Sequence, residues 1–387
     1  MNIIFFDGPE WETLRPFTLT KPVAELRIGI LKFAERWQKL LKGNYSFLTQ
    51  DYLANKYKVE AESQNLFINS VFFPNGELVQ SIQNLREGES IWYKESLVAA
   101  NTGLNAFQSK RFKEKQSIQS TIIQIQHLWD LFTYNPFAIQ YDFDLLTEGR
   151  QSQAISETNR IIHPERVFLE EGAVVEHAIL NATDGPIYVG VEAEIMEGSM
   201  IRGGLALCEH GKINMGAKIY PGTTIGPHSK VGGEVNNSIL MGYSNKGHDG
   251  FLGNSVLGEW CNLGADTNNS NLKNNYSNIR LWDYSTKSYI DTGLQFCGLM
   301  MGDFSKSAIN TQFNTGTVVG VSANVFDPGF PPKFIPSFSW GGKKDSEKFD
   351  LEKSFDAAEK MMVRRKKLLT EKDKYILNHI FSESSLN

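Results

Sequence analysis

An apolar residue recurs at every sixth position through the middle of the chain, and this repeat constrains the fold more than any other feature. Eight positions carry it without a miss, namely Val189, Ile195, Ile201, Leu207, Ile213, Ile219, Ile225 and Val231. A helix needs a period near 3.6 and a half-buried strand a period of 2. A period of six is typical of a hexapeptide solenoid, whose short strands stack at ~4.7–4.9 Å and whose apolar ladders fill the interior. We therefore predict a parallel β-helix at 160–335, with a ladder that serves packing alone.

The residues on either side of the repeat have a different pattern. Of the 33 glycines, 7 lie in 1–150, 26 lie in 151–342 and none follows Gly342. Residues 1–150 alternate apolar runs such as IIFF (3–6) with helical stretches, which predicts an α/β domain with a Rossmann-like arrangement. Residues 345–387 are highly charged and space their apolar residues by three and four, which predicts a tail of one or two amphipathic helices. Within the solenoid, the asparagine-rich stretch 266–295 breaks the register, and we expect it to form a loop.

Composition and charge exclude several classes of protein. The formal net charge of −5 argues against binding to nucleic acid, which requires clustered Lys and Arg. No stretch approaches the ~18 apolar residues of a membrane span, so we expect no membrane association. Three cysteines without CxxC spacing are typical of a reducing compartment, and we expect a cytoplasmic protein. No histidine pair has metal-ligand spacing, so we predict no metal site.

His248 is the candidate catalytic residue, because it lies between glycines in Gly247-His248-Asp249-Gly250, where a solenoid turn is expected. Imidazole titrates near neutrality and can take a proton from an amine or hydroxyl as it attacks an acyl carbonyl. The other interpretation is a histidine that only satisfies neighbouring carbonyls. Taken alone, a single histidine favours this second interpretation.

The stretch SNKGHDGFLGNSVLGEWCNLGADTNNSN (244–271) resembles the acetyltransferase half of the bifunctional N-acetylglucosamine-1-phosphate uridyltransferase / glucosamine-1-phosphate acetyltransferase family, GlmU. The resemblance implies that His248 is the general base and that Asn262 helps to hold the sugar phosphate. It also implies that Asn271 lies near the acetyl group and that the backbone of Ala265 approaches the pantetheine arm. Acetyl-CoA or another acyl-CoA would be the co-substrate. The family further implies a left-handed coil and a homotrimer with sites shared between neighbouring solenoids.

Two departures from the family pattern concern the acceptor. The family tyrosine three residues after the histidine is Phe251 here, and the family arginine of R-P-G is Tyr220, with Lys218 two residues before it. We predict that Lys218 and Tyr220 contact the acceptor. Because phosphate anchoring is weakened, we expect a sugar phosphate or sugar nucleotide other than glucosamine 1-phosphate.

The opening of the chain resembles that of the sugar nucleotidyltransferases, whose pattern is G-x-G-T-R-x-x-P-x-T-x-x-x-P-K. The matching residues imply nucleotide-phosphate contacts from Gly8, Arg15 and Lys21. The family's glycine loop is replaced by the sequence PEWE (9–12), and no acid occurs in 67–70, where the family's magnesium-binding aspartate is expected. This difference leaves a requirement for Mg²⁺ open.

These features favour a transferase that moves an acyl group from acyl-CoA to a sugar or sugar nucleotide, either alone or coupled to sugar-nucleotide synthesis. One alternative is a sugar-1-phosphate nucleotidyltransferase whose β-helix only trimerises it. Another is a non-catalytic sensor or scaffold that binds a sugar nucleotide. The basic run at 362–367 is interpreted as a solvated helix face, with contact to CoA phosphates as the other possibility.

Overall fold

The computed structural model describes residues 1–118, 120–343 and 346–384, and its chain divides into two compact units. The first unit comprises Met1–Leu14, Thr18–Leu26 and Leu31–His127. The second contains everything from Leu128 onward, together with Arg15–Phe17 and Arg27–Ile30. Two short pieces of the N-terminal region therefore belong to the compact unit that holds the solenoid.

The first unit is built on a mixed six-stranded sheet in the order β2-β1-β3-β5-β4-β6. Strand β1 runs parallel to β2 and β3, and all five of its residues are buried, as the continuous apolar run IIFF predicts. The strands are β1 (Asn2–Phe6), β2 (Asn44–Leu48), β3 (Asn65–Asn69), β4 (Glu89–Tyr93), β5 (Ser96–Thr102) and β6 (Glu114–Ser117). The helices of this part of the chain are α1 (Glu10–Thr13), α2 (Phe33–Leu40), α3 (Asp51–Ala54), α4 (Gly76–Gln83) and α5 (Leu104–Gln108), with short 3₁₀ turns at Phe17–Leu19 and Val23–Glu25.

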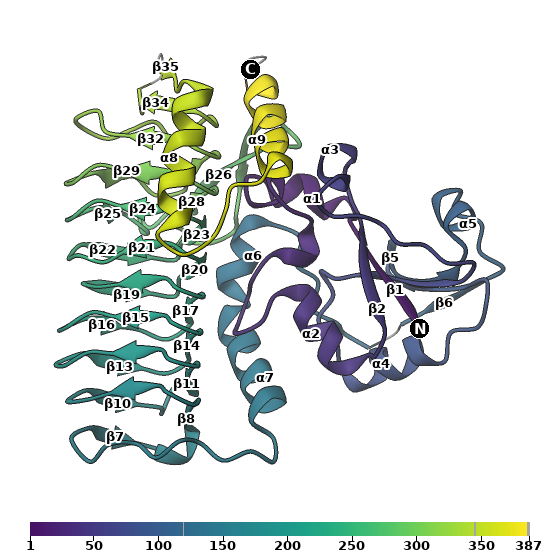
Figure 1. Ribbon diagram of the computed structural model, residues 1–387, viewed down its shortest axis with the longest axis horizontal. Helices are drawn as coiled ribbons and strands as arrows, with labels where there is room; N and C mark the ends of the chain where they lie inside the picture. The colour runs from purple at the N-terminus through teal and green to yellow at the C-terminus, as the bar shows by residue number, and fades with distance from the viewer. Residues whose placement is uncertain (119, 344–345, 385–387) are drawn as a thin grey trace. The chain divides into compact units, whose positions relative to one another are not determined.

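The second unit is a β-solenoid of about ten turns, in which three stacks of short strands form the walls (Figure 1). The first sheet contains β7 (Arg160–Ile162), β10 (Ile179–Asn181), β13 (Met200–Arg202), β16 (Lys218–Ile219), β19 (Glu234–Asn236) and β22 (Phe251–Gly253). The second contains β8 (Val167–Leu169), β11 (Ile187–Val189), β14 (Leu205–Leu207), β17 (Thr223–Ile225), β20 (Ile239–Gly242), β23 (Val256–Glu259), β28 (Leu299–Met301), β31 (Thr317–Val319) and β33 (Phe334–Ile335). The third contains β9 (Val174–Val175), β12 (Glu194–Ile195), β15 (Lys212–Ile213), β18 (Lys230–Val231), β21 (Asn245–Lys246), β24 (Asn262–Leu263), β29 (Lys306–Ser307), β32 (Asn324–Val325), β34 (Ser339–Gly341) and the antiparallel β35 (Glu347–Lys348).

The predicted apolar ladder fills the interior of this solenoid. All eight of its residues are at most 2% exposed, and equivalent residues of successive turns pair directly, as in Ile195 with Ile213 and Ile213 with Val231. The predicted β-helix is thus confirmed, since each turn adds one apolar layer to a continuous core. The left-handed coil implied by the resemblance remains a prediction.

The asparagine-rich stretch leaves the solenoid later than predicted. Strand β25 (Asn268–Asn269) still pairs with β30 (Gln312–Phe313), and the chain departs only after it. The excursion is not a simple loop, because β26 (Arg280–Asp283) and β27 (Ser288–Asp291) form an antiparallel hairpin within it.

Helices cover parts of the solenoid wall. Helices α6 (Leu128–Thr133) and α7 (Asn135–Thr147) precede the first turn, and Ile139 of α7 belongs to an apolar cluster with Tyr188 and Ala206 on the outer face of the second sheet. The predicted tail forms α8 (Leu351–Val363) and α9 (Glu371–Glu383), which confirms the amphipathic helices (Figure 1). An ion pair of 2.9 Å between Lys374 and Glu359 joins α9 to α8.

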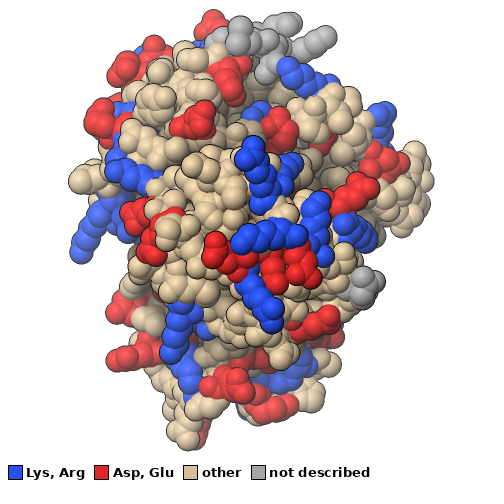
Figure 2. Space-filling view, turned by 90° about the vertical axis from the view of Figure 1, so that its right-hand side faces the viewer, with Lys and Arg blue, Asp and Glu red and all other residues tan. Residues whose placement is uncertain are grey.

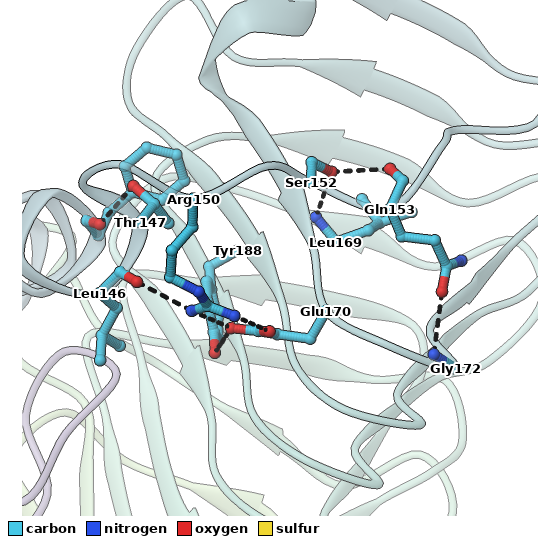
Figure 3. Close-up of polar contacts among 10 residues, drawn as sticks. Leu146, Thr147, Arg150, Ser152, Gln153, Leu169, Glu170, Gly172 and Tyr188 are labelled. Carbon is cyan, nitrogen blue, oxygen red and sulfur yellow. Dashed lines mark hydrogen bonds and ion pairs between the residues drawn. The ribbon is translucent and has the colours of Figure 1, made fainter.

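A buried carboxylate anchors the chain between α7 and the first turns (Figure 3). Glu170, 9% exposed, accepts two hydrogen bonds from the guanidinium of Arg150 and one, at 2.8 Å, from the Tyr188 hydroxyl. Hydrogen bonding to the carboxylate raises the pKa of Arg150, and burial raises the pKa of Tyr188. Each oxygen of the carboxylate therefore has a donor, which makes its burial tolerable.

Candidate functional site

A row of polar side chains runs along the outer face of the third sheet. Strands β18, β21, β24 and β29 are hydrogen-bonded neighbours, and the register places Lys230, Asn245, Asn262 and Lys306 directly side by side. Because side chains alternate across a strand, these residues point outward while their successors occupy the interior. The hexapeptide repeat thus produces a ladder of two lysines and two asparagines at the ~4.8 Å spacing of strands.

This row lines a cavity of about 800 Å³ that is bounded on its other side by the end of α8. His248, the segment 263–265 and Ile309 also line the cavity. Helix α8 and the turn after it contribute Lys360, Met361, Arg364 and Arg365. Arg365 also donates a hydrogen bond of 3.3 Å to the carbonyl of His228, which ties the end of α8 to a solenoid corner.

The electrostatics of the cavity favour an anionic ligand. Of the described residues that line it, five are cations and none is an aspartate or glutamate, the cations being Lys230, Lys306, Lys360, Arg364 and Arg365. Burial lowers the pKa of Lys230, and the nearby cations Arg365, Lys212 and Arg364 lower it further. Burial also lowers the pKa of Lys306. Cations that repel one another in a partly enclosed space attract anions, so this cavity is a suitable site for phosphate groups.

Hydrogen bonds hold the backbone of 247–250, the segment that carries His248, at every residue. Each of the four carbonyls of 247–250 accepts a hydrogen bond, and the donors are Asn214 Nδ2 to Gly247 at 2.7 Å, Lys246 Nζ to His248 at 2.9 Å, the Asp266 amide to Asp249 at 3.1 Å and the Glu234 amide to Gly250 at 3.2 Å. The side chain of His248, by contrast, is exposed at the cavity wall. An exposed imidazole on a rigid backbone is the arrangement that a general base requires.

Stacked aromatic rings follow one corner of the solenoid up to the cavity. The centroids of His210 and His228 lie 4.5 Å apart, those of His228 and Tyr243 5.1 Å apart, and those of Tyr243 and Trp260 4.2 Å apart. All four residues have a positive φ, so that the same left-handed turn recurs at this corner and places successive rings over one another. Tyr243 and Trp260 form part of the cavity wall.

The structure brings some of the predicted site residues together and leaves others apart. His248, Asn262 and Ala265 all line the cavity. The side chain of Asn271 instead donates a hydrogen bond of 2.8 Å to Asn254, and Asn271 does not line the cavity.

Lys218 and Tyr220 are not cavity residues either. Lys218 lies on β16, which belongs to the first sheet of the solenoid and not to the third, and Tyr220 follows that strand. Both are exposed, Tyr220 by 39%.

Sequence reasoning missed the cationic wall of the cavity. Lys230 and Lys306 directly precede an inward-pointing residue, and this position in the hexapeptide is the signal that locates them. The basic run at 362–367 is not wholly a solvated face, because Arg364 and Arg365 of that run line the cavity.

In the first unit, two acids, the half-buried Asp7 and the buried Glu10, occupy the carboxyl end of β1, where the family resemblance implies a phosphate. Glu10 is 4% exposed and accepts hydrogen bonds from Gln124 at 2.7 Å and Asn69 at 3.4 Å. A Cβ atom on Gly8 would lie 2.3 Å from a carboxylate oxygen of Glu10, so a larger residue at position 8 would require the Glu10 side chain to move. Asp7 accepts a hydrogen bond of 2.9 Å from the Val23 amide, and burial raises its pKa to about 7.

The three residues predicted to contact nucleotide phosphates have different surroundings. Gly8 lies beside Glu10, Lys21 is only 4% exposed within the first unit, and Arg15 belongs to the second unit, near Tyr284. Among the described residues, no three His, Cys, Asp or Glu side chains are grouped so as to hold a metal ion. The carboxylates of Asp7 and Glu10 already accept hydrogen bonds from protein donors, so we derive no magnesium-dependent step.

Positive and negative side chains are mixed on the face of the molecule that Figure 2 shows. Figure 2 shows Lys and Arg interspersed with Asp and Glu over one face of the molecule, without an extended basic stripe on that face. Within the described ranges, none of the helices has the length and apolar run that crossing a membrane requires.

Comparison with known proteins finds one matching family model and several similar proteins. Residues 3–151 match the family model described as sugar nucleotidyl transferase. The chain is 32% identical over 106 residues to the bifunctional protein GlmU of Methanocaldococcus jannaschii, covering 27% of this chain and 25% of that protein. It is 30% identical over 108 residues to the GlmU of Methanococcus aeolicus, again covering 27% of this chain and 25% of the relative.

A third relative is named for both activities. The bifunctional sugar-1-phosphate nucleotidylyltransferase/acetyltransferase of Sulfurisphaera tokodaii is 26% identical over 147 residues, which cover 38% of this chain and 36% of that protein. The three matches thus cover between 25% and 36% of the lengths of these relatives. Residues 3–151 are thus similar to the sugar nucleotidyl transferases, and the resemblance of the chain to the bifunctional GlmU-type transferases, expected from its sequence, is confirmed.

Proposed function

We propose that the protein is an acyltransferase that moves an acyl group from acyl-CoA, with acetyl-CoA as the first candidate, to an amine or hydroxyl of a sugar phosphate or sugar nucleotide. The observation that carries the proposal is the exposed imidazole of His248, held on a segment whose four carbonyls are all bonded, at the wall of a cationic cavity. The name of the Sulfurisphaera tokodaii relative, which includes acetyltransferase, supports the same reaction class.

In the proposed reaction, His248 removes the proton from the acceptor as its nitrogen or oxygen attacks the thioester carbonyl. The carbon–sulfur bond then breaks, and the protonated imidazole returns its proton to the leaving thiolate. Charge develops on the carbonyl oxygen, and a backbone N–H is the donor suited to stabilise it. The N–H of Gly264 already donates to Ser307 at 3.0 Å, whereas among the described residues the N–H of Ala265 has no partner, so we assign this role to Ala265.

Substrate binding follows from the other residues that line the cavity. Asn262 lies next to Asn245 on the sheet and orients the acceptor through its side-chain amide. The five cations bind phosphate groups, which CoA, sugar phosphates and sugar nucleotides all carry.

We also propose a cytoplasmic homotrimer, as the resemblance implies. Ile179 and Met200 pair on neighbouring strands of the first sheet and are 45% and 55% exposed, and an exposed apolar face favours contact with another copy. Lys218, Tyr220 and Asn271 do not line the cavity of their own chain, so a role for them requires a neighbouring copy. The three cysteines are buried and none forms a disulfide within the described part of the chain, which agrees with a reducing compartment. We further propose that the chain has three domains, which are an α/β domain at 1–150, a β-helix at 160–335 and a helical tail at 345–387.

The test is release of CoA thiol from acetyl-CoA in the presence of amino sugars, sugar phosphates and sugar nucleotides. We expect turnover with at least one acceptor and a loss of about 10²- to 10⁴-fold in His248→Ala, the usual contribution of general-base catalysis. His177→Ala is the matched control, because His177 is another exposed histidine of the solenoid, and it should leave the rate unchanged. Full activity of His248→Ala would overturn the proposal.

Nucleotidyl transfer is the second candidate, and the family match of residues 3–151 favours it. It predicts release of pyrophosphate from a nucleoside triphosphate and a sugar 1-phosphate, and loss of this release in Arg15→Ala. Against it, Glu10 occupies the carboxyl end of β1. The remaining alternative, a non-catalytic sensor or scaffold, fails if either turnover is seen.

A further inference from the structure

One lysine occupies a place in the solenoid core that other turns give to apolar residues. Lys246 pairs with Val231 in the register of the third sheet, below Leu263 of the next turn, and it is only 2% exposed. Equivalent positions in the preceding turns hold Ile195 and Ile213. Removing an ammonium group from water costs several kcal/mol, so a core that needed only packing would favour an aliphatic side chain here.

The ammonium group makes two hydrogen bonds, and both are to the backbone around His248. Nζ donates to the carbonyl of Gly232 at 2.8 Å and to the carbonyl of His248 itself at 2.9 Å. It therefore connects the turn of one coil to the catalytic segment of the next. Burial lowers the pKa of Lys246 to about 8, although the carboxylates of Asp249 and Asp266 oppose this shift.

The two backbone segments that Lys246 joins are in close contact. A Cβ atom on Gly232 would lie 2.6 Å from the carbonyl oxygen of Gly247, and one on Gly233 would lie 2.8 Å from the Cα of Asp249. A displacement of Gly232 is therefore transmitted directly to 247–249. From the interior of the solenoid, the ammonium group of Lys246 bonds to both of these segments, through Gly232 and His248.

We propose that Lys246 is a positioning residue, which fixes the backbone of His248 so that its imidazole projects into the cavity at the angle that proton transfer requires. The inference rests on the proposed role of His248 as a general base. A misplacement of a catalytic group by about 1 Å can cost on the order of 100-fold in rate, which sets the scale of the expected effect.

The test compares Lys246→Met with the wild-type full-length protein. Methionine fits an apolar ladder position and removes the buried charge, so the melting temperature should stay close to that of the wild type. The two carbonyls lose their donor, so kcat in the thiol-release assay should fall by roughly 10- to 100-fold while KM for acetyl-CoA stays within about twofold. Ile213→Met is the matched control at an equivalent ladder position and should change neither quantity.

Amide hydrogen exchange gives a readout that does not depend on activity. Lys246→Met should accelerate exchange of the amides of Glu234 and Asp266, which donate to the carbonyls of Gly250 and Asp249, whereas Ile213→Met should not. If the methionine variant misfolds, Lys246→Gln, whose amide can still donate to one of the two carbonyls, takes its place and should give an intermediate acceleration. Unchanged exchange at the amides of Glu234 and Asp266, or a global loss of protection with kcat retained, would overturn the inference, while retained activity in His248→Ala would instead overturn the proposed function.

Discussion

At the scale of single residues, the decisive positions are those where a charged side chain takes a buried place. The apolar ladder could be read from the sequence, but Lys246 could not, because the turn before it is short. Ile213 and Val231 pair at a separation of 18 residues, whereas Val231 and Lys246 pair at a separation of 15. Counting by six from Val231 therefore leads to Tyr243 and Asp249 and passes over the lysine. A register interrupted by a short turn hides which residue points inward.

Asp7 gives a prediction at the same scale. Burial raises its native pKa to about 7, from about 3.9 in an unfolded chain. Between these values the unfolded state binds fewer protons than the native state, so stability falls as the pH rises from about 4 to 7 and levels off above that. Asp7→Asn mimics the protonated acid and can keep the hydrogen bond from Val23. We expect a gain in unfolding free energy of about 4 kcal/mol above pH 7 and little below pH 4.

Urea unfolding of the full-length protein at a series of pH values measures this difference. Asp51→Asn serves as the control, because Asp51 is an exposed acid of α3 in the same unit. A difference between Asp7→Asn and the wild type that does not vary with pH would show that the buried acid stays ionised.

At the scale of elements, α8 shows what an amphipathic pattern does and does not predict. The spacing of Ala358 and Met362 correctly indicates the face that is buried, at 3% and 8% exposure. Nothing in that spacing says what the polar face meets. The cavity is formed by the sheet and the end of α8 together, so only the folded chain reveals that Arg364 and Arg365 line it.

The cations of this element should therefore control the binding of phosphate-bearing ligands. In the double variant Arg364→Gln/Arg365→Gln, we expect Kd for CoA to rise roughly 10- to 100-fold, since a hydrogen bond to a charged group contributes about 1.5–3 kcal/mol. Affinity of the wild type should also fall with added salt, and less steeply in the variant. Calorimetry at two salt concentrations gives both quantities. Lys372→Gln, on the exposed surface of α9, is the control, and equal affinity of all three proteins would rule out the cationic wall as the binding site.

At the scale of the whole molecule, the sequence predicts the order of the α/β part, the solenoid and the helical tail better than it predicts which residues form the candidate site. A six-residue period, a glycine-rich middle and a charged tail determine the solenoid and its helices, because each pattern has one structural solution. The candidate site depends on non-local register. His248, Asn262 and Ala265 come together because they lie in adjacent turns, whereas Asn271 follows β25, where the chain leaves the solenoid, and bonds to Asn254 instead.

The oligomeric state is the remaining property of the whole molecule, and the first sheet allows a direct test. Met200 is 55% exposed at the centre of a sheet face that also exposes Ile179. If this face joins copies of the chain, Met200→Glu introduces like charges into the interface and should convert the trimer to monomers with the fold retained. Light scattering measures the mass and circular dichroism the fold. Tyr375→Glu, which adds the same charge at an exposed aromatic residue of α9, should leave the mass unchanged. A trimer that persists in Met200→Glu would assign the contact to another face, and a monomeric wild type would require every residue of the acyl site to come from one chain.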